Sequence, residues 1–263
     1  MTFSKIALYS FNAAHTGTLD HIEKILDCAQ KLESISDLSA QYDLLILIGG
    51  DGSLIHCAQY AIEHNIPIIG INTGKIGFLT DIKTDDINQR LLEITSGQFT
   101  LEQRPLLECA LNGQNIGHCV NEITLTRSQA LQMIHYDVYL NHQHLHAHRA
   151  DGMIISTPTG STAYALSAGG PILHPQIAGI LLQPLCSHKV NTKPLVTSLT
   201  DHIRIIYHPQ KGSNAAIYLD GNHSFELKDT STIDIKKSDK CLNLIHPLGF
   251  DFYQTLKTKL GWN

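Results

Sequence analysis

Short apolar runs and segments of helical periodicity alternate along the amino-terminal part of the chain. The apolar runs are too short for helices and are bounded by turn residues, which is typical of buried parallel strands. The segments between them repeat apolar residues at intervals of three and four, which indicates amphipathic helices. Such alternation predicts a parallel sheet covered by helices on both faces. Strands are expected at 4–9, 44–48 and 68–71, and helices at 19–32, from Ser53 to about His64, and at about 85–95.

The pattern changes after Gly97. From there, short segments rich in β-branched and aromatic residues are separated by Gly, Asn or Pro, which predicts an all-β or mostly-β domain. Helical spacing returns at 252–260, and we expect this helix to pack back on the first domain. The chain is thus predicted to form an α/β domain at 1–97, completed by about 249–263, and a β-rich domain at 98–248.

The glycine-rich turn GGDGS at 49–53 is the first candidate for chemistry. Glycine leaves no Cβ between the backbone and a ligand, and Ser53 is a suitable N-cap for the helix that follows. Free N–H groups and the helix dipole at such a corner attract phosphate. A carboxylate inside it, Asp51, indicates a group that holds a metal ion or accepts a proton. The alternative is a tight structural turn in which Asp51 caps its own helix.

Two common nucleotide-binding motifs do not match this sequence. The segment GINTGK at 70–75 is one residue short of a P-loop and is followed by Ile76 instead of Ser or Thr. No G-x-G-x-x-G motif follows a predicted strand, so a parallel sheet of Rossmann-like order would lack the dinucleotide fingerprint. The chain is therefore expected to be neither a Walker ATPase nor a Rossmann dehydrogenase.

Composition narrows the class of protein further. Of 263 residues, 43% are hydrophobic and 16% charged, and the formal net charge is −5. These values indicate a globular protein, and the lack of a long basic run argues against nucleic acid or an anionic membrane as a partner. The sequence shows no signal peptide and no apolar stretch long enough to span a bilayer. Six cysteines without C-x-x-C spacing favour reduced thiols in a cytoplasmic protein.

A second candidate site lies within the β-rich half, at 149–171. A short strand at 153–156 leads through a Pro-bearing turn into Gly160-Ser161-Thr162 and a short Ala-rich helix. Small side chains there allow a ligand to approach closely, and Tyr164 offers a ring that could stack on a base. Arg149 and Asp151 stand at its entrance. A glycine-rich strand–helix corner without a ligand is the alternative.

Four histidines alternate in HQHLHAHR, at positions 142, 144, 146 and 148. On a regular strand they would share one face, with Leu145 and Ala147 opposite and Arg149 turned away from the histidines. Neighbouring imidazoles can chelate a transition metal. A solvated polar face is the simpler interpretation, and no structural metal is expected here.

Several motifs, taken in chain order, resemble those of the NAD kinases, and the match covers nearly the whole chain. Ser53 for the commoner Thr and Ile76 for Leu are conservative departures. The tail at 242–262 also resembles the proteobacterial branch of the family. The motifs are GGDGS at 49–53, NTGKIGFL at 72–79, the pair Asn121-Glu122, and the segment 151–170, which contains STPTGSTAY.

The resemblance implies an enzyme with its active site between an α/β domain and a β-sandwich-like domain. It implies transfer of the terminal phosphoryl group of ATP, or of polyphosphate, to the 2′-hydroxyl of the adenosine ribose of NAD. Asp51 would orient and deprotonate that hydroxyl as a general base. Mg²⁺ or another divalent cation would bind through the substrate phosphates, without metal ligands from the protein. A homodimer or homotetramer in the cytoplasm is also implied.

The resemblance further implies a set of substrate-binding residues. His56 would lie near phosphate, and Cys186 and His188 would reach a neighbouring subunit's site. That last match is partial, because Ser187 replaces the usual Pro and the sequence diverges from Lys189 onwards. The remaining residues are Asn121, Glu122, Asp151, Thr162, Ala163, Tyr164 and Ser167 for NAD, with Gly52, Phe78, Arg149, Thr159 and Asn222 as further candidates.

Two other functions stay open at this point. Lipid kinases and phosphofructokinases share the GGDG loop, which would explain Asp51 but neither the Asn121-Glu122 pair nor the GSTAY corner at 160–164. A catalytically silent NAD-binding regulator would keep Asn121 and Tyr164 but would not need the acid.

Overall fold

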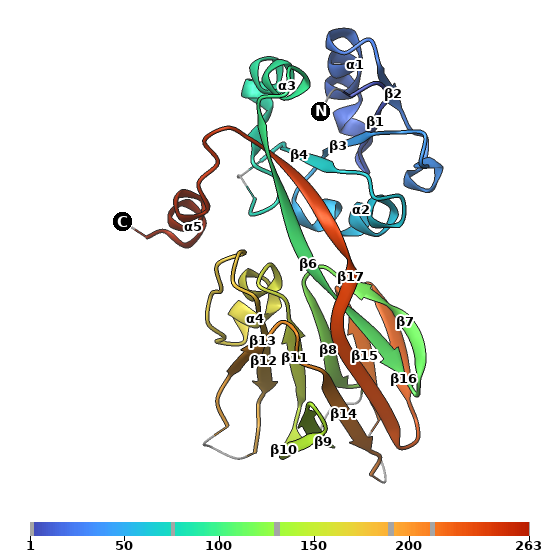
Figure 1. Ribbon diagram of the computed structural model, residues 1–263, viewed down its shortest axis with the longest axis vertical. Helices are drawn as coiled ribbons and strands as arrows, with labels where there is room; N and C mark the ends of the chain where they lie inside the picture. The colour runs from blue at the N-terminus through green and yellow to red at the C-terminus, as the bar shows by residue number, and fades with distance from the viewer. Residues whose placement is uncertain (1–2, 75–76, 129–131, 189–191, 211–213, 263) are drawn as a thin grey trace. The chain divides into compact units, whose positions relative to one another are not determined.

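The computed structural model describes residues 3–74, 77–128, 132–188, 192–210 and 214–262. Lys75, Ile76, Lys189 and Val190 therefore lie outside the described residues. The chain divides into two compact units, Met1–Gln103 with Leu242–Asn263, and Arg104–Cys241 (Figure 1). Among the described residues, no helix combines the length and the apolar character needed to cross a membrane.

The first unit is built on a parallel sheet with the order β2-β1-β3-β4-β17, and β5 also pairs with β4. The order of its first four strands is one of the two common orders of doubly wound sheets. The parallel α/β prediction is confirmed. The elements are β1 (Ile6–Tyr9), α1 (Thr16–Ile25), β2 (Ala29–Lys31), β3 (Leu44–Ile48), α2 (Asp51–Glu63), β4 (Ile68–Asn72), β5 (Ile82–Lys83), α3 (Ile87–Thr95), α5 (Phe252–Leu260), and parts of β6 (Phe99–Leu111) and β17 (Ser231–Pro247). Short 3-10 turns occupy Ala13–His15, Ile35–Asp37 and Thr84–Asp86.

Every residue of β3 is buried, because helices cover both faces of the sheet. Leu44, Ile46 and Ile48 pack in one apolar cluster with residues of α1 and α3. Leu45 and Leu47 point to the opposite face and are also fully buried. Figure 1 shows α1 and α3 on one side of the sheet and α2 on the other. This two-sided burial explains why the strand is an unbroken apolar run and not an alternating one.

The structure corrects the helix expected at 19–32. Helix α1 ends at Ile25, and residues 29–31 form the edge strand β2, parallel to β1. Ile22, Leu26 and Ala29 are all buried, so the apolar spacing does mark the core. Ala29 reaches that core from a strand, however, and spacing alone does not distinguish the two cases.

The expected start of α2 was also wrong. Ser53 is not the N-cap: the helix begins at Asp51, and Gly50 occupies the N-cap position without any side-chain cap. The side chain of Asp51 is therefore free to interact elsewhere. The other helices expected in this unit are confirmed, and α5 covers 252–260 as predicted.

The second unit contains two mostly antiparallel sheets, as the sequence predicts. One includes the order β10-β9-β14-β17 together with β6 and β7, and the other has the order β13-β12-β11-β8-β15-β16. Residues from both sheets form one large apolar core, so the unit is sandwich-like. The remaining elements are β7 (Gln114–Cys119), β8 (Glu122–Arg127), β9 (Ile134–Leu140), β10 (Gln143–Ala150), β11 (Gly152–Ser156), a 3-10 turn (Gly160–Thr162), α4 (Tyr164–Ser167), β12 (Gly179–Leu185), β13 (Leu195–Ser198), β14 (Ile203–His208), β15 (Ala215–Leu219) and β16 (His223–Leu227).

The histidine-rich segment does not form the regular face that the sequence predicts. His142 lies in the turn before β10 with a φ of 69°, and the pairing of β10 with β9 shifts register between His144 and His146. His148 is buried and its ring stacks on Tyr136, with 5.1 Å between the centroids. The interpretation as a solvated polar face is therefore wrong for His148. No group of three or more His, Cys, Asp or Glu suited to a metal ion occurs among the described residues.

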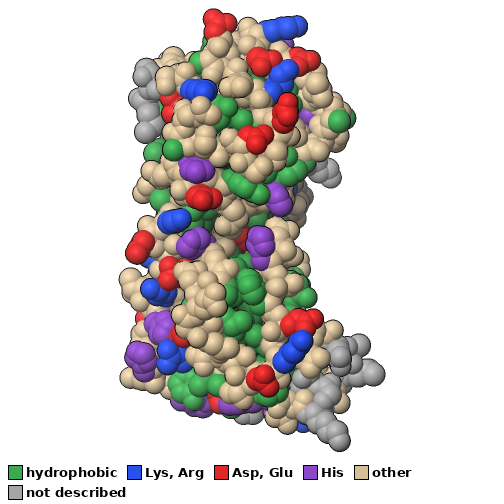
Figure 2. Space-filling view, turned by 90° about the vertical axis from the view of Figure 1, so that its right-hand side faces the viewer, with side chains coloured by type: hydrophobic (Ala, Val, Ile, Leu, Met, Phe, Trp, Pro, Cys, Tyr) green, Lys and Arg blue, Asp and Glu red, His purple; other side chains and the backbone are tan. Residues whose placement is uncertain are grey.

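Charged side chains are interspersed on the face drawn in Figure 2, where acidic and basic groups of the described residues alternate within each unit. That face presents no stripe of one sign among those residues. All six cysteines are unbridged, and three of them, Cys57, Cys109 and Cys119, are buried.

Candidate active site

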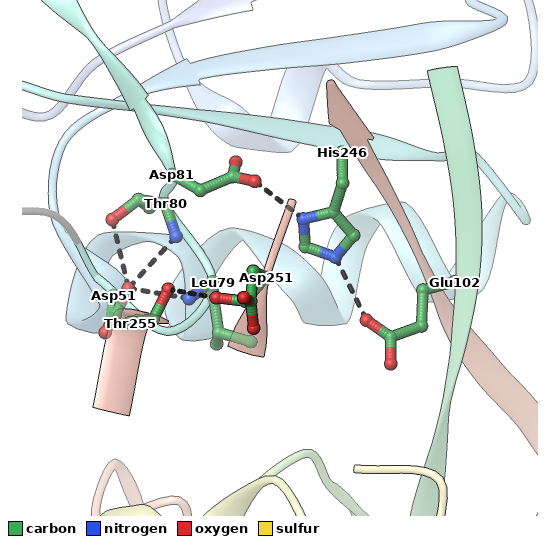
Figure 3. Close-up of polar contacts among 8 residues, drawn as sticks. All are labelled: Asp51, Leu79, Thr80, Asp81, Glu102, His246, Asp251 and Thr255. Atoms are coloured by element: carbon green, nitrogen blue, oxygen red, sulfur yellow. Dashed lines mark hydrogen bonds and ion pairs between the residues drawn. The ribbon is translucent and has the colours of Figure 1, made fainter. Parts of the chain in front are cut away.

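The carboxylate of Asp51 is held by the loop that follows β4. Its Oδ1 accepts the backbone N–H groups of Leu79 and Thr80, each at 3.1 Å, and the Thr80 hydroxyl at 3.0 Å (Figure 3). Its Oδ2 accepts the N–H of Phe78 at 2.8 Å. These partners come from a different loop, so Asp51 does not cap its own helix. Oδ1 accepts three of these four hydrogen bonds and Oδ2 accepts one, so Oδ2 can accept a further hydrogen bond.

The loop can approach Asp51 this closely only because position 77 is glycine. A Cβ there would lie 1.8 Å from Asp51 Oδ1 and 2.4 Å from the Thr80 hydroxyl oxygen, so both side chains would have to leave their present positions. The N–H of Gly77 donates to the carbonyl oxygen of Thr80 at 2.8 Å, and the side-chain amide of Asn72 donates to the Thr80 hydroxyl oxygen at 2.8 Å. Thus Asn72, Gly77 and Thr80, all within or beside the segment 72–79 that resembles the family, serve to fix Asp51.

A buried histidine fixes the far end of the same loop. His246, in β17, is 1% exposed, with Nδ1 2.9 Å from Asp81 and Nε2 3.1 Å from Glu102 (Figure 3). Its ring stacks on Phe250 with 4.1 Å between the centroids. Burial alone lowers the pKa of His246, but hydrogen bonds to Asp81 and Glu102 and their charges raise it overall. The imidazolium therefore anchors Asp81, the residue that directly follows Thr80.

Helix α5 brings a cation to Asp51 that the sequence reasoning missed. Lys259 Nζ lies 4.0 Å from Asp51 Oδ2 and 5.8 Å from the centroid of the Phe78 ring. The signal was present in the spacing: Phe252, Thr255 and Leu256 are the buried residues of α5, and position 259 continues that stripe at i+7. Lys259 is partly exposed to solvent, with 31% of its side chain accessible, and its position on the stripe directs its ammonium group toward the loop that holds Asp51.

In the second unit, the pair Asn121-Glu122 is held by an aspartate that sequence reasoning also missed. Asp220 accepts the backbone N–H groups of Val120, Asn121 and Glu122 at 2.8, 2.7 and 3.1 Å. Its own φ of 48° is left-handed, as expected for an Asp-Gly turn. The Asp-Gly dipeptide predicts the turn, but not that its carboxylate binds another strand.

The Asn121-Glu122 pair and the 151–170 segment form one structure. The Thr157 N–H donates to the Asn121 carbonyl oxygen at 2.9 Å, and the Thr157 hydroxyl donates to the Val120 carbonyl oxygen at 2.6 Å. A Cβ on Gly160 would lie 2.1 Å from the Asn121 carbonyl oxygen, so position 160 requires glycine. The glycine of this corner therefore permits contact with Asn121, beside the residues predicted to bind NAD.

Glu122 is an unusual member of this group because its side chain is buried beside a second acid. Its Oε2 has no hydrogen-bond partner among the described residues. Burial, and then the nearby charge of Asp220, raise the pKa of Glu122 to about 8. Both oxygens of Asp220 accept backbone N–H groups, which favours the ionised form there. Burial nevertheless raises the pKa of Asp220 as well, so both acids of this pair bind a proton more readily than free carboxyl groups do.

Other predicted residues lie around the same corner. Thr159 is buried and accepts a hydrogen bond from Arg104 at 3.3 Å. Tyr164 is 47% exposed, so its ring is available to a ligand. Thr162 and Ala163 are half-buried and Ser167 is exposed, while Asn222 lies in the turn after β15 with its N–H bonded to Leu219.

A second group lies at the opposite end of β11. Ser156 pairs with Glu122 and Gly152 pairs with Thr126, so the two ends of the strand are about 13 Å apart. Asp151 forms an ion pair with Arg127 at 3.2 Å. Arg149, Cys186 and His188 are exposed near that end, and the His188 N–H donates to the Arg149 carbonyl oxygen. Within one chain, these residues are not brought together with Asn121 and Glu122.

The two remaining predicted residues belong to α2. Gly52 is exposed in the first turn, next to Asp51. His56 is exposed one turn further on, and its ring contacts Phe11 edge to face with 5.0 Å between the centroids. Both therefore lie on the open side of the helix that begins at Asp51.

The architecture is shared with solved structures at low sequence identity. A yeast NADH kinase, whose structure was determined with NADH, matches 100% of this chain and 89% of its own with a TM-score of 0.87 at 23% identity. An NAD kinase from Archaeoglobus fulgidus, determined in complex with ATP, matches 98% of this chain and 97% of its own with a TM-score of 0.80 at 24% identity. The protein therefore belongs to the fold class of these two structures, with an α/β unit and a sandwich-like β unit.

Sequence comparisons narrow the class to one family. Family models described as the ATP-NAD kinase N-terminal and C-terminal domains match residues 8–99 and 120–247. An NAD kinase of Legionella pneumophila (strain Paris) is 43% identical over 229 residues, which is 86% of this chain and 78% of that protein. An NAD kinase of Teredinibacter turnerae is 40% identical over 240 residues, which is 90% of this chain and 82% of that protein. The chain belongs to the NAD kinase family and is an enzyme that makes NADP by phosphorylating NAD. This finding decides against a lipid kinase, a sugar kinase or a silent regulator.

Proposed function

We propose that Asp51 is the general base of this reaction and that Oδ2 is the atom that receives the proton. The observation that carries the proposal is the unequal use of the two carboxylate oxygens. Oδ1 accepts three hydrogen bonds and Oδ2 accepts one, from Phe78. The loop thus fixes the carboxylate while Oδ2 keeps an acceptor position for the 2′-hydroxyl of the adenosine ribose.

The reaction forms a bond between the ribose 2′-oxygen and the terminal phosphorus of ATP, and breaks the bond from that phosphorus to ADP. The hydroxyl proton passes to Asp51 Oδ2. Phosphoryl transfer depends mainly on positioning and on neutralisation of charge, so a weak base that is held rigidly is sufficient. Four donors from one short loop support such rigidity.

The residues of the second unit are proposed to hold NAD. The exposed ring of Tyr164 would stack on a base, and Asn121 and Glu122 would offer polar groups to the sugars. Their fixed backbone, bonded to Asp220 and Thr157, supports a pre-formed site. Proposed further contacts are Thr159, Thr162, Ala163, Ser167 and Asn222, with Gly52, His56 and Phe78 near the phosphates.

ATP is the proposed phosphoryl donor, with polyphosphate as a second possibility, and a divalent cation such as Mg²⁺ is proposed to accompany it. No cluster of acidic or histidine ligands suited to a metal occurs among the described residues. Mg²⁺ commonly binds through substrate phosphates and keeps several of its waters, so few protein ligands are needed. Bound to the phosphates, the cation would neutralise charge during transfer.

We also propose a homo-oligomer, a homodimer or homotetramer, located in the cytoplasm. Arg149, Asp151, Cys186 and His188 lie at the end of β11 away from Asn121, which supports their serving the site of a neighbouring subunit. The six unbridged cysteines support a reducing compartment.

The test is NADP⁺ formation from NAD and MgATP by the wild type and by Asp51→Asn. Loss of a positioned base reduces the rate by roughly 10²–10⁴-fold, so we expect kcat to fall by that amount in the variant. Asp85→Asn, at an exposed acid of the same unit, should keep wild-type activity. Thermal unfolding of each variant checks that the fold is intact. Wild-type activity in folded Asp51→Asn would refute the role of Asp51.

A further inference from the structure

Helix α5 contacts the loop that holds Asp51 with one side of its surface. The rings of Phe252 and Phe78 lie with their centroids 6.0 Å apart. Thr255 and Leu256 are buried on the same side of the helix. Lys259, one turn further on, is the charged member of this stripe. The helix thus carries the lysine to the reacting carboxylate through apolar contacts, not through a long flexible side chain alone.

Lys259 and Asp51 form a partly exposed ion pair at the outer limit of the usual distance. Lys259 Nζ is 4.0 Å from Asp51 Oδ2, beyond hydrogen-bond distance. The two side chains are 31% and 29% exposed, so neither is buried by the other. An oxygen atom at normal hydrogen-bond distance from both Nζ and Oδ2 fits into this gap. The pair is therefore open to a third group.

The charge of Asp51 creates a need that Lys259 can meet. The 2′-hydroxyl is bound to the ionised carboxylate of Asp51, and this carboxylate repels the negatively charged phosphoryl group that has to approach the hydroxyl. An ammonium group beside the carboxylate offsets this repulsion and donates hydrogen bonds to phosphoryl oxygens. Within 4.0 Å of the Asp51 carboxylate, Lys259 is the positively charged side chain that the described residues supply. In this arrangement Lys259 can bind an oxygen of the phosphoryl group while Asp51 binds the hydroxyl that attacks it.

We propose that Lys259 is a further catalytic residue, whose ammonium group binds the terminal phosphoryl group of ATP while Asp51 Oδ2 accepts the hydroxyl proton. Lys259 stays protonated throughout and donates hydrogen bonds to oxygens of the transferred group. The bonds formed and broken are those of the transfer to the 2′-oxygen, and the proton goes to Asp51. The inference rests on the role proposed above for Asp51.

The experiment compares Lys259→Met with Lys257→Met. Lys257 lies in the same last turn of α5 and is exposed, on the side of the helix away from the buried stripe. Its replacement by Met therefore removes the same charge and has the same effect on helix propensity as Lys259→Met. We expect Lys259→Met to lower kcat about 10²–10³-fold, as for loss of a donor to developing charge, with KM for NAD within twofold of wild type. Lys259→Arg should recover part of the loss, and Lys257→Met should behave as wild type.

A binding measurement separates a phosphate contact from a structural role. A non-hydrolysable ATP analogue carries the terminal group and ADP does not, so Lys259→Met should weaken binding of the analogue and leave binding of ADP unchanged. Equal weakening of both ligands, or a loss of kcat that Lys257→Met reproduces, would overturn the proposal. If Lys259→Met unfolds, the same comparison is made with Lys259→Arg and Lys259→Gln.

The outcomes also separate this inference from the role of Asp51. Wild-type kcat in Lys259→Met, alongside a strong loss in Asp51→Asn, would refute Lys259 alone. Wild-type kcat in Asp51→Asn would refute the base, and with it the arrangement in which Lys259 serves that base.

Discussion

At the residue scale, the active-site region of the first unit depends on one buried imidazolium. His246 lies between Asp81 and Glu102, and its pKa is raised above its usual value by these two partners despite burial. A histidine whose folded pKa is raised stabilises the fold fully below the unfolded pKa of about 6.5. That contribution is lost as the pH rises through the folded pKa. The loop that carries Thr80 should therefore be less well anchored in alkaline solution.

The variant His246→Asn tests this dependence. Removal of one partner of a buried ion pair is destabilising by about 3 kcal/mol, so the variant should be less stable than wild type by that amount at pH 6. The difference should shrink as the pH is raised above the folded pKa, because the wild-type histidine is then neutral as well. Urea unfolding at a series of pH values measures it, with the exposed His21→Asn as control. A difference that is constant with pH would show that the charge of His246 is not what stabilises the loop.

At the scale of elements, the N-cap of α5 connects the stability of a helix to catalysis. Asp251 accepts the N–H groups of Tyr253 and Gln254 at 2.8 and 3.3 Å. Asp251→Ala should lower the free energy of unfolding by about 1 kcal/mol, whereas Asp251→Asn should retain most of it, since Asn is also a good N-cap. If α5 positions Lys259, kcat should be lower in Asp251→Ala, which loses the N-cap, and close to wild type in Asp251→Asn, which keeps it. Unchanged kcat in Asp251→Ala would mean that α5 holds Lys259 without its cap.

Elements that are defined by burial were predictable from the sequence. Strand β3 and helix α5 occur where the apolar pattern places them. The end of α1 was not predictable, because Ala29 is buried whether it belongs to a helix or to an edge strand. The expected boundary near residue 98 falls at the start of β6, a strand that runs from the first unit into the second.

The candidate site was predictable where motifs are contiguous and not where contacts are long-range. The GGDGS turn marked Asp51, but four donors from residues 78–80 follow from the tertiary fold. Asp220 binds the backbone of residues nearly one hundred positions earlier in the chain, as the separation of 99 from Asn121 shows. Lys259 was marked only by its place in a helical stripe. No local pattern reports the partner of such a side chain.

At the scale of the whole molecule, one strand belongs to both units. Residues 231–235 of β17 pair with β14 in the second unit, and Leu244 of the same strand pairs with Ile68 in the first. A break in this strand would expose backbone groups in both sheets. The two units should therefore unfold together.

Buried thiols measure this coupling. Burial raises the pKa of Cys57 and of Cys109 to about 12, so both resist alkylation in the native state, whereas Cys186 is exposed. Cys57 reports on the first unit and Cys109 on the second. We expect both to become reactive at the same urea concentration in pulsed alkylation followed by mass spectrometry, with Cys186 labelled without urea. Two clearly separate midpoints would show that β17 does not couple the units.

The division of the first unit into two stretches of chain has a consequence for synthesis on the ribosome. Asp51 emerges early, but the residues that complete its surroundings, His246 and Lys259, follow the whole of the second unit. At about 5–20 residues per second, a nascent chain spends roughly 10–40 seconds with its base exposed and its lysine not yet translated. A truncated product would thus bind phosphate poorly and transfer none, so that partial chains in the cell draw little on the supply of ATP.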